Sequence, residues 1–307
     1  MDLNLVAQDL RPVVPKFRLP LESRYVRYFL NGVLSILPSQ TVQGVRIQRR
    51  DAVGHGLRVF IPEVRRSRGA LLWIHGGGLI IGHPVIDDRF CAETARALGI
   101  VVASVRYRLA PNHPYPAAID DCQTGWDYLV GAASSLGFDA GRVAIGGQSA
   151  GGGLAAALVQ RVCDTALPHP IAQWLFCPML DDRTAARRDL DALRHFVWDN
   201  RLNAFGWSAY LGAEPGEQTT PAYAVPARRE VTKNLPATWI GVGDIDLFFD
   251  EDVRYAEQLK AGGVPTTIDV VPGAPHGFER WGAQTETGSA YVRRAREWLE
   301  RALTVEP

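Results

Sequence analysis

Short apolar segments rich in β-branched and aromatic residues recur along most of the chain. Several are apolar at every position, as in Leu71–Ile74 and Ile100–Ala103, so both faces of the strands they form must be covered. The pattern predicts eight strands, at Val45–Arg50, Leu57–Pro62, Ala70–His75, Ile100–Tyr107, Arg142–Gly147, Ile171–Met179, Ala237–Gly243 and Thr266–Val271.

Helical periodicity occupies the intervals between most of these strands. The predicted helices are Asp87–Leu98, Pro116–Val130, Ala150–Asp164, Phe249–Ala261 and a last one near Ser289–Leu303. Strands that alternate with helices indicate an α/β fold whose sheet is mostly parallel and is flanked by helices.

Two segments interrupt the alternation. Residues 1–44 have a helical pattern and precede the first strand. Residues 181–230 separate two strands by far more than the roughly 2–6 residues of an ordinary connection in an α/β unit. We therefore predict that these two segments form a helical cap, and that residues 45–180 and 231–307 form the two parts of a catalytic core.

Composition excludes several classes of protein. The chain has 33 Lys and Arg against 33 Asp and Glu, so it lacks the basic surface of a nucleic-acid binder or a polybasic membrane contact. The four cysteines form no C-x-x-C pair and have no histidine at metal-finger spacing, which predicts buried thiols and no metal site. Since no signal peptide or run of ~18 apolar residues is visible, we expect a soluble, cytoplasmic protein.

The strongest chemical signal is Gly147-Gln148-Ser149-Ala150-Gly151, between a predicted strand and a helix of small residues. This strand–turn–helix context is that of a nucleophile elbow, in which a serine lies on a turn too tight for side chains two positions away. The turn also places the serine at a helix N-terminus, which favours developing negative charge. The alternative is a glycine-rich turn with an incidental serine.

A second signal, His75-Gly76-Gly77-Gly78, follows the third predicted strand. Consecutive glycines let backbone N–H groups point into open space, where they can stabilise the oxyanion of a tetrahedral intermediate. We assign the amides of Gly77 and Gly78 to this oxyanion hole, with Ala150 as the third donor and Gly76 as a substitute for one of them. A phosphate-binding loop is less favoured, because no Lys-Ser/Thr pair or G-x-G-x-x-G spacing follows.

A histidine and a carboxylate must complete such a site. His276 lies in Ala274-Pro275-His276-Gly277-Phe278, after the last predicted strand, and is favoured over six other histidines by its position in the chain. If the chain order is Ser…Asp…His, the acid must fall between Ser149 and His276. Asp244, Asp246 and Asp250 all follow the seventh predicted strand, and spacing alone does not choose among them.

Together these motifs resemble the α/β-hydrolase fold and, within it, the hormone-sensitive-lipase-like esterases of bacteria. The resemblance rests on the segments His75–Gly82, Tyr107–Pro111, Tyr115–Ala118, Gly147–Gly152 and Pro275–Phe278. It implies that Asp246 is the catalytic acid, that the N-terminal helices and the 181–230 insertion form the cap, and that no cofactor is needed. A homodimer is also in keeping with the family. Gln148 departs from the family pattern, which commonly has an acidic residue before the nucleophile.

The predicted activity is that of a serine carboxylesterase acting on a small-molecule ester with a short to medium acyl chain. Ser149 attacks, His276 acts as base and acid, and Asp246 orients the histidine. Two alternatives remain: an amidase or formamidase with the same triad, and a non-catalytic small-ligand receptor on the same fold. A lipase for insoluble fat is less favoured, because no large exposed apolar lid can be read from the sequence.

Overall fold

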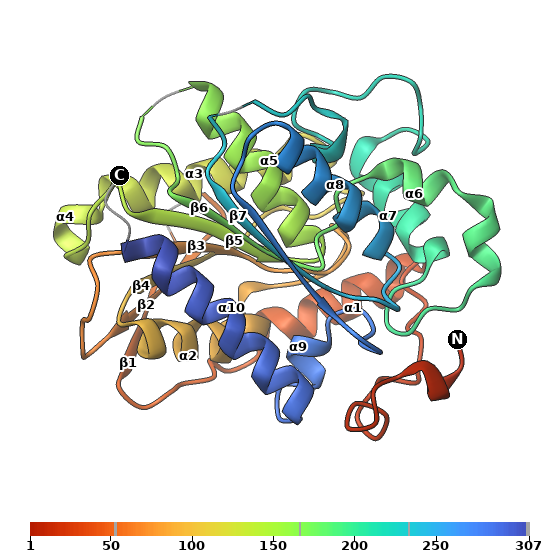
Figure 1. Cartoon of the computed structure of the whole chain (residues 1–307), viewed down its shortest axis with the longest axis horizontal. Coiled ribbons are helices and arrows are strands. Elements are labelled where there is room, and N and C mark those ends of the chain that lie inside the picture. Colours follow the sequence, from red (N-terminus) through yellow and green to blue (C-terminus); the bar gives the residue numbers. More distant parts are fainter. Residues whose placement is uncertain (52–53, 166, 233, 305–307) are drawn as a thin grey trace.

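A single mixed sheet of eight strands runs through the centre of the molecule (Figure 1). The computed structural model describes residues 1–51, 54–165, 167–232 and 234–304. The strand order is β1-β2-β4-β3-β5-β6-β7-β8. The strands are β1 (Val45–Arg50), β2 (Leu57–Pro62), β3 (Ala70–Ile74), β4 (Val101–Val105), β5 (Val143–Gln148), β6 (Ala172–Phe176), β7 (Ala237–Gly243) and β8 (Thr266–Val271).

The sheet is parallel except at one edge. β2 pairs antiparallel with both β1 and β4, and every other neighbouring pair is parallel. The carboxyl ends of the central parallel strands therefore meet at one edge of the sheet, where ligand sites of α/β proteins form. The prediction of a mostly parallel sheet flanked by helices is confirmed, with each of the eight strands within three residues of its expected ends.

Helices cover both faces of the sheet, as the fully apolar strands require (Figure 1). On one face, helices α3 (Ala117–Gly131), α5 (Ala150–Thr165) and α8 (Phe249–Ala261) contribute to the first of two apolar cores. On the other face, helices α2 (Asp88–Leu98) and α10 (Glu286–Thr304) contribute to the second. The short helices α4 (Ala133–Leu136) and α9 (Phe278–Trp281) complete the core.

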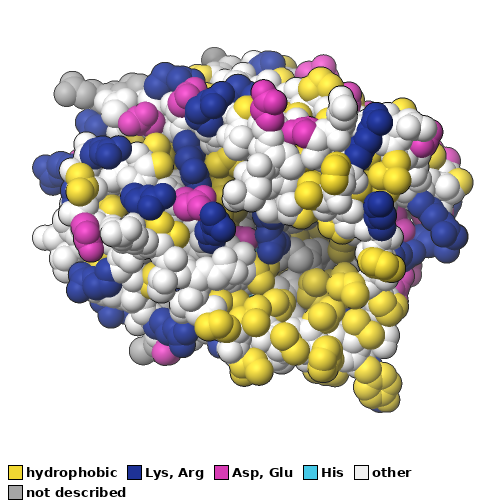
Figure 2. Space-filling model, turned by 90° about the horizontal axis from the view of Figure 1, so that it is seen from below, with side chains coloured by type: hydrophobic (Ala, Val, Ile, Leu, Met, Phe, Trp, Pro, Cys, Tyr) yellow, Lys and Arg dark blue, Asp and Glu magenta, His cyan; other side chains and the backbone are white. Residues whose placement is uncertain are grey.

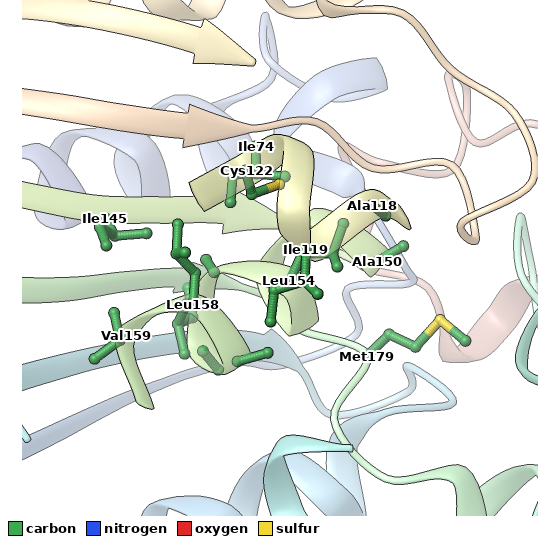
Figure 3. Packing of buried hydrophobic residues seen from close by; sticks show 14 of the residues in the cluster. Ile74, Ala118, Ile119, Cys122, Ile145, Ala150, Leu154, Leu158, Val159 and Met179 are labelled. Atoms are coloured by element: carbon green, nitrogen blue, oxygen red, sulfur yellow. The ribbon is translucent and has the colours of Figure 1, made fainter. Parts of the chain in front are cut away.

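Small side chains let α5 lie close to the middle of the sheet (Figure 3). Ala155, Ala156 and Ala157 are buried, and Leu154 and Leu158 of the same helix pack in the same apolar core as strand residues. Close packing of this kind fixes the start of α5, and with it the turn that precedes the helix.

The segment before β1 is less helical than predicted. It contains a short 3-10 helix at Leu3–Leu5 and one α-helix, α1 (Arg24–Ile36), and the rest of residues 1–44 consists of turns and extended chain. The segment has four prolines, which lack the backbone N–H that a continuous helix needs. The insertion between β6 and β7 contains α6 (Asp182–Ala186), α7 (Asn200–Leu211) and two 3-10 helices at Arg188–Ala192 and Pro226–Arg228.

Helix α1 turns much of its apolar surface to solvent. Tyr25, Phe29 and Ile36 are exposed, whereas Arg27 is the one buried side chain of the helix. Figure 2 shows an apolar patch on this side of the molecule, beside a hollow in the surface. The sequence does not reveal this surface, because the pattern of an amphipathic helix does not tell which of its faces points inward.

Helix α1 is joined to the core through polar contacts. The Asn31 side chain accepts a hydrogen bond from the Gly82 amide at 3.0 Å and donates one to the Ile80 carbonyl at 3.4 Å. Arg27 lies over the ring of Phe205 in α7.

Within the described ranges, no helix combines the length and the apolar character that crossing a membrane requires.

Candidate active site

Ser149 lies on a strained turn between β5 and α5. Its φ is +56°, a left-handed conformation that non-glycine residues rarely adopt. The turn needs glycine on both sides: a Cβ added to Gly147 would lie 2.2 Å from the Gly151 carbonyl oxygen, and one added to Gly151 would lie 2.1 Å from that of Ile74. The backbone of Ser149 is also tied to the end of β6, since its amide donates to the Phe176 carbonyl at 2.8 Å. This is the geometry of a nucleophile elbow.

Three side chains from the ends of three strands meet at this turn. Nε2 of His276, which follows β8, lies 2.8 Å from Oγ of Ser149. Nδ1 of the same ring lies 2.8 Å from Oδ2 of Asp246, which follows β7. All three side chains are buried. The imidazole is thus placed to take a proton from the hydroxyl while the carboxylate holds its orientation.

The structure distinguishes the three candidate acids. The second oxygen of Asp246 accepts the Phe248 amide at 2.9 Å, which fixes the carboxylate. Asp244 instead accepts the Gly273 amide at 2.7 Å and lies outside the triad. Asp250 is exposed at the start of α8 and lies 3.8 Å from Arg187. Only Asp246 reaches His276.

The electrostatics around His276 favour its cation. Burial of the imidazole opposes protonation, but the neighbouring Asp246 carboxylate and its hydrogen bond outweigh burial, so the pKa of His276 is raised above its ordinary value. A raised pKa makes the histidine a stronger base toward the serine proton, and the paired carboxylate stabilises the imidazolium that results.

The glycine loop after β3 lies across from the elbow. Gly77 and Gly78 have φ values of +125° and +60°, and a Cβ on Gly77 would lie 1.9 Å from the Ile81 carbonyl oxygen. In the described part of the chain, neither glycine amide donates a hydrogen bond. The Ala150 amide begins α5, where helix N–H groups have no partner within the helix. These three amides are available as oxyanion donors.

The insertion packs directly on this loop. A Cβ on Gly78 would lie 2.1 Å from Cη2 of Trp198, and one on Gly206 of α7 would lie 2.8 Å from the Gly78 carbonyl oxygen. The sequence did not reveal this contact, because nothing in the pattern pairs Trp198 with a glycine more than a hundred residues earlier.

His75 lies outside the triad. Its ring is fully buried, stacks on Tyr107 at 4.3 Å between centroids, and has Nδ1 2.8 Å from the Gly76 carbonyl oxygen. Burial lowers the pKa of His75 to about 4, so the ring is neutral at pH 7. The Tyr107 hydroxyl donates to the His75 carbonyl at 2.8 Å. These contacts hold the start of the glycine loop.

Gln148, the departure from the family pattern, lies between two loops of the site. A Cβ on Gly76 would lie 2.1 Å from its Oε1, and a Cβ on Gly277 would lie 3.1 Å from its Nε2. The amide thus fills the space between the glycine loop and the histidine loop. Nε2 also lies 3.8 Å from Sγ of Cys177.

Three buried carboxyl groups near the site were not singled out from the sequence. Glu251 accepts the amides of Leu180 and Asp181 at 2.7 and 3.1 Å, and burial raises its pKa to about 8. Burial raises the pKa of Asp252 well above its ordinary value and that of Glu279 to about 7. No sequence pattern marks such residues, because their burial depends on tertiary packing.

Cys177, Asp246 and His276 place their ligand atoms within 4.8 Å of one another, a spacing that would suit a metal ion. The triad contacts already account for Asp246 and His276. Burial raises the pKa of the Cys177 thiol well above its ordinary value, so the thiolate that binds metals is disfavoured there. We therefore interpret the group as a triad beside a buried cysteine.

Comparison with known proteins identifies a family and relatives of the chain. The family model described as the alpha/beta hydrolase fold matches residues 71–280. Esterase LipI from Mycobacterium tuberculosis is 33% identical over 227 residues, which cover 73% of this chain and 70% of LipI. Ethyl acetate hydrolase from Pseudomonas putida is 32% identical over 269 residues, covering 85% of this chain and 83% of that protein. Among solved structures, bacterial heroin esterase superposes with a TM-score of 0.88 at 30% identity and covers 99% of each chain.

Proposed function

Because the chain belongs to the α/β-hydrolase family, among its hormone-sensitive-lipase-like esterases, it is a carboxylic ester hydrolase, and we propose that it acts through an acyl-enzyme on Ser149. The observation that carries the proposal is the pair of 2.8 Å contacts that link Ser149, His276 and Asp246. The amides of Gly77, Gly78 and Ala150 beside them supply the oxyanion hole.

Acylation follows from the order of these contacts. Nε2 of His276 takes the proton of Ser149 while Oγ attacks the ester carbonyl carbon. The carbonyl oxygen becomes an oxyanion and accepts hydrogen bonds from the three amides. The imidazolium, paired with Asp246, then protonates the alcohol oxygen as the carbon–oxygen bond breaks, which leaves the acyl group on Ser149.

Deacylation repeats the sequence with water in place of serine. His276 takes a proton from water, the hydroxide attacks the acyl carbon, and a second oxyanion forms in the same hole. Collapse of this intermediate returns the proton to Oγ of Ser149 and releases the acid. Asp246 keeps the imidazole in the tautomer that presents Nε2 to the serine.

The substrate that we propose is an ester of a short- to medium-chain acid. Support comes from relatives: one curated relative is an ethyl acetate hydrolase and another, from Mycobacterium tuberculosis, is a carboxylesterase. A non-catalytic receptor is disfavoured, because the three side chains are intact and in hydrogen-bond contact.

The test is hydrolysis of p-nitrophenyl acetate by the wild type and by Ser149→Ala. We expect the variant to lose about 10³–10⁶ of kcat, since the nucleophile is gone. Ser208→Ala, on helix α7, is the matched control and should retain wild-type turnover. Wild-type activity in Ser149→Ala would refute the mechanism. A matched anilide substrate, cleaved at the same rate as the ester, would instead indicate an amidase.

A further inference from the structure

Two cavities of very different size lie near the Ser149–His276 pair. One, of about 570 Å³, is lined by Gln148, His276 and Gly277 and extends to Phe90 of α2 and Arg296 of α10. The other, of about 10 Å³, is lined by Ala150, Leu79 and residues of α7. The first extends along the face of the sheet covered by α2 and α10, and the second along the face covered by α5.

The mechanism determines which part of the ester enters each cavity. His276 must protonate the leaving alcohol oxygen, so that oxygen lies next to Nε2 and the alcohol portion extends along the side of His276. The acyl chain is attached to the opposite side of the carbonyl carbon and points away from the histidine. The large cavity, which His276 lines, therefore receives the alcohol, and the small one beside Ala150 receives the acyl chain.

Buried rings close the acyl side. Trp207, Tyr210 and Met179 line the small cavity and are each at most 2% exposed. Its volume is at the lower limit of what holds one water molecule, so it leaves room for only a very small acyl group. Nε1 of Trp207 and the Tyr210 hydroxyl have no hydrogen-bond partner in the described ranges, so a longer alkyl chain would be pressed against polar atoms and immobile rings.

The alcohol side offers room and a different lining. The rings of Phe90 and Trp281 and the guanidinium groups of Arg280 and Arg296 surround the large cavity. Arg296 lies over the Phe90 ring at 5.5 Å. Aromatic faces and guanidinium planes both stack on flat rings, and the volume exceeds what an ethyl group fills.

We propose that the enzyme is selective for esters of very short acids, acetate above all, with bulky ring-bearing alcohols, and that Trp207 sets the acyl limit. This inference rests on the proposed function, because it assigns the two cavities from the role of His276. Under this proposal, Trp207 is a specificity-determining residue, and the large cavity is the binding site for the alcohol portion of the ester.

The acyl arm of the test compares kcat/KM for p-nitrophenyl acetate and p-nitrophenyl hexanoate, which share a leaving group. We expect the wild type to prefer acetate by roughly 100-fold, and Trp207→Ala to reduce that preference to about tenfold or less. Met179→Ala enlarges the same cavity from the core side and should act in the same direction. Tyr210→Phe, which removes a polar atom from this cavity but keeps the ring, should reduce the acetate preference much less than Trp207→Ala does.

The alcohol arm compares ethyl acetate with 2-phenylethyl acetate, whose leaving groups have similar reactivity. We expect the wild type to prefer the phenylethyl ester, and Ala283→Phe, which fills part of the large cavity, to lower its kcat/KM about tenfold more than that of ethyl acetate.

Outcomes of the two arms separate this inference from the proposed function. Equal wild-type rates on acetate and hexanoate, or an unchanged ratio in both folded Trp207→Ala and folded Met179→Ala, would overturn the acyl limit. Equal rates on the two acetates would overturn the alcohol site. In either case the enzyme would still hydrolyse esters through Ser149. If the wild type cleaved none of these esters, the proposed function itself would fail.

Discussion

Glu279 gives a quantitative prediction about stability and pH. Its side chain is buried, and neither carboxylate oxygen has a hydrogen-bond partner in the described part of the chain. Burial raises its pKa to about 7 from the ordinary 4.5. The folded protein therefore holds this proton more tightly than the unfolded chain does, so the associated stability is present below pH 4.5 and is lost as the pH rises through 7.

The magnitude follows from the two pKa values. A difference between about 7 and 4.5 corresponds to roughly 3 kcal/mol of unfolding free energy at pH 8, at about 1.4 kcal/mol per tenfold change in proton affinity. Glu279→Gln keeps the shape and removes the titration. We expect the variant to gain up to roughly 3 kcal/mol over the wild type at pH 8 and to gain far less at pH 5.

Urea unfolding at pH 5 and pH 8, followed by tryptophan fluorescence, measures both free energies. Glu257→Gln, on an exposed position of α8, is the matched control and should leave the pH dependence unchanged. If Glu279→Gln and the wild type differed by the same amount at both pH values, the carboxyl group would not be held neutral by burial, and this reasoning would be refuted.

Three further predictions concern catalysis. Asp246→Asn should lower kcat about 10³–10⁴-fold, whereas Asp244→Asn and Asp250→Asn should change kcat little. Equal losses of kcat in the three variants would contradict the assignment of Asp246 as the catalytic acid. Since the pKa of His276 is raised by Asp246, the kcat/KM of the wild type should fall as the pH drops through a midpoint above 6.5. The residual activity of Asp246→Asn should show a lower midpoint in the same pH titration. An unshifted midpoint in the variant would contradict Asp246 as the cause of the raised pKa. Gly78→Ala should lower kcat roughly 100-fold or more, because its Cβ would displace Trp198 and the donor amide. Gly212→Ala shares a positive φ but meets no atom within 4 Å, so it should cost stability alone, and equal kcat losses in the two variants would argue against Gly78 as a donor.

Much of the fold could be predicted from the sequence, because local hydrophobic patterns determine most of its strands and helices. The all-apolar strands and the small-residue helix after Ser149 require a buried sheet with helices on both faces, and the structure has this arrangement. The N-terminal segment was harder to predict, since its apolar periodicity indicated more helix than its four prolines allow. Which face of α1 points to solvent depends on its partners, Gly82 and Phe205, and these are distant in sequence.

Some residues of the candidate site could likewise be identified from local sequence patterns, and others could not. Ser149 and the glycine loop have local signatures, and chain order identified His276, whereas Asp246 needed the family resemblance because three aspartates follow the same strand. The structure brings Asp246 to His276 and leaves Asp244 on a neighbouring turn. The contact between Trp198 and Gly78 and the burial of the Glu279 carboxyl group are products of tertiary packing and have no local signal in the sequence.

The central claim is that Ser149 carries the acyl group during turnover. Rapid acid quenching of the enzyme with p-nitrophenyl acetate, followed by mass spectrometry of the peptides, tests this claim most directly. The account predicts one added acetyl group on the peptide that contains Ser149, and none in the Ser149→Ala variant. An acetyl group on another residue, or turnover with no acylated peptide at any quench time, would contradict it.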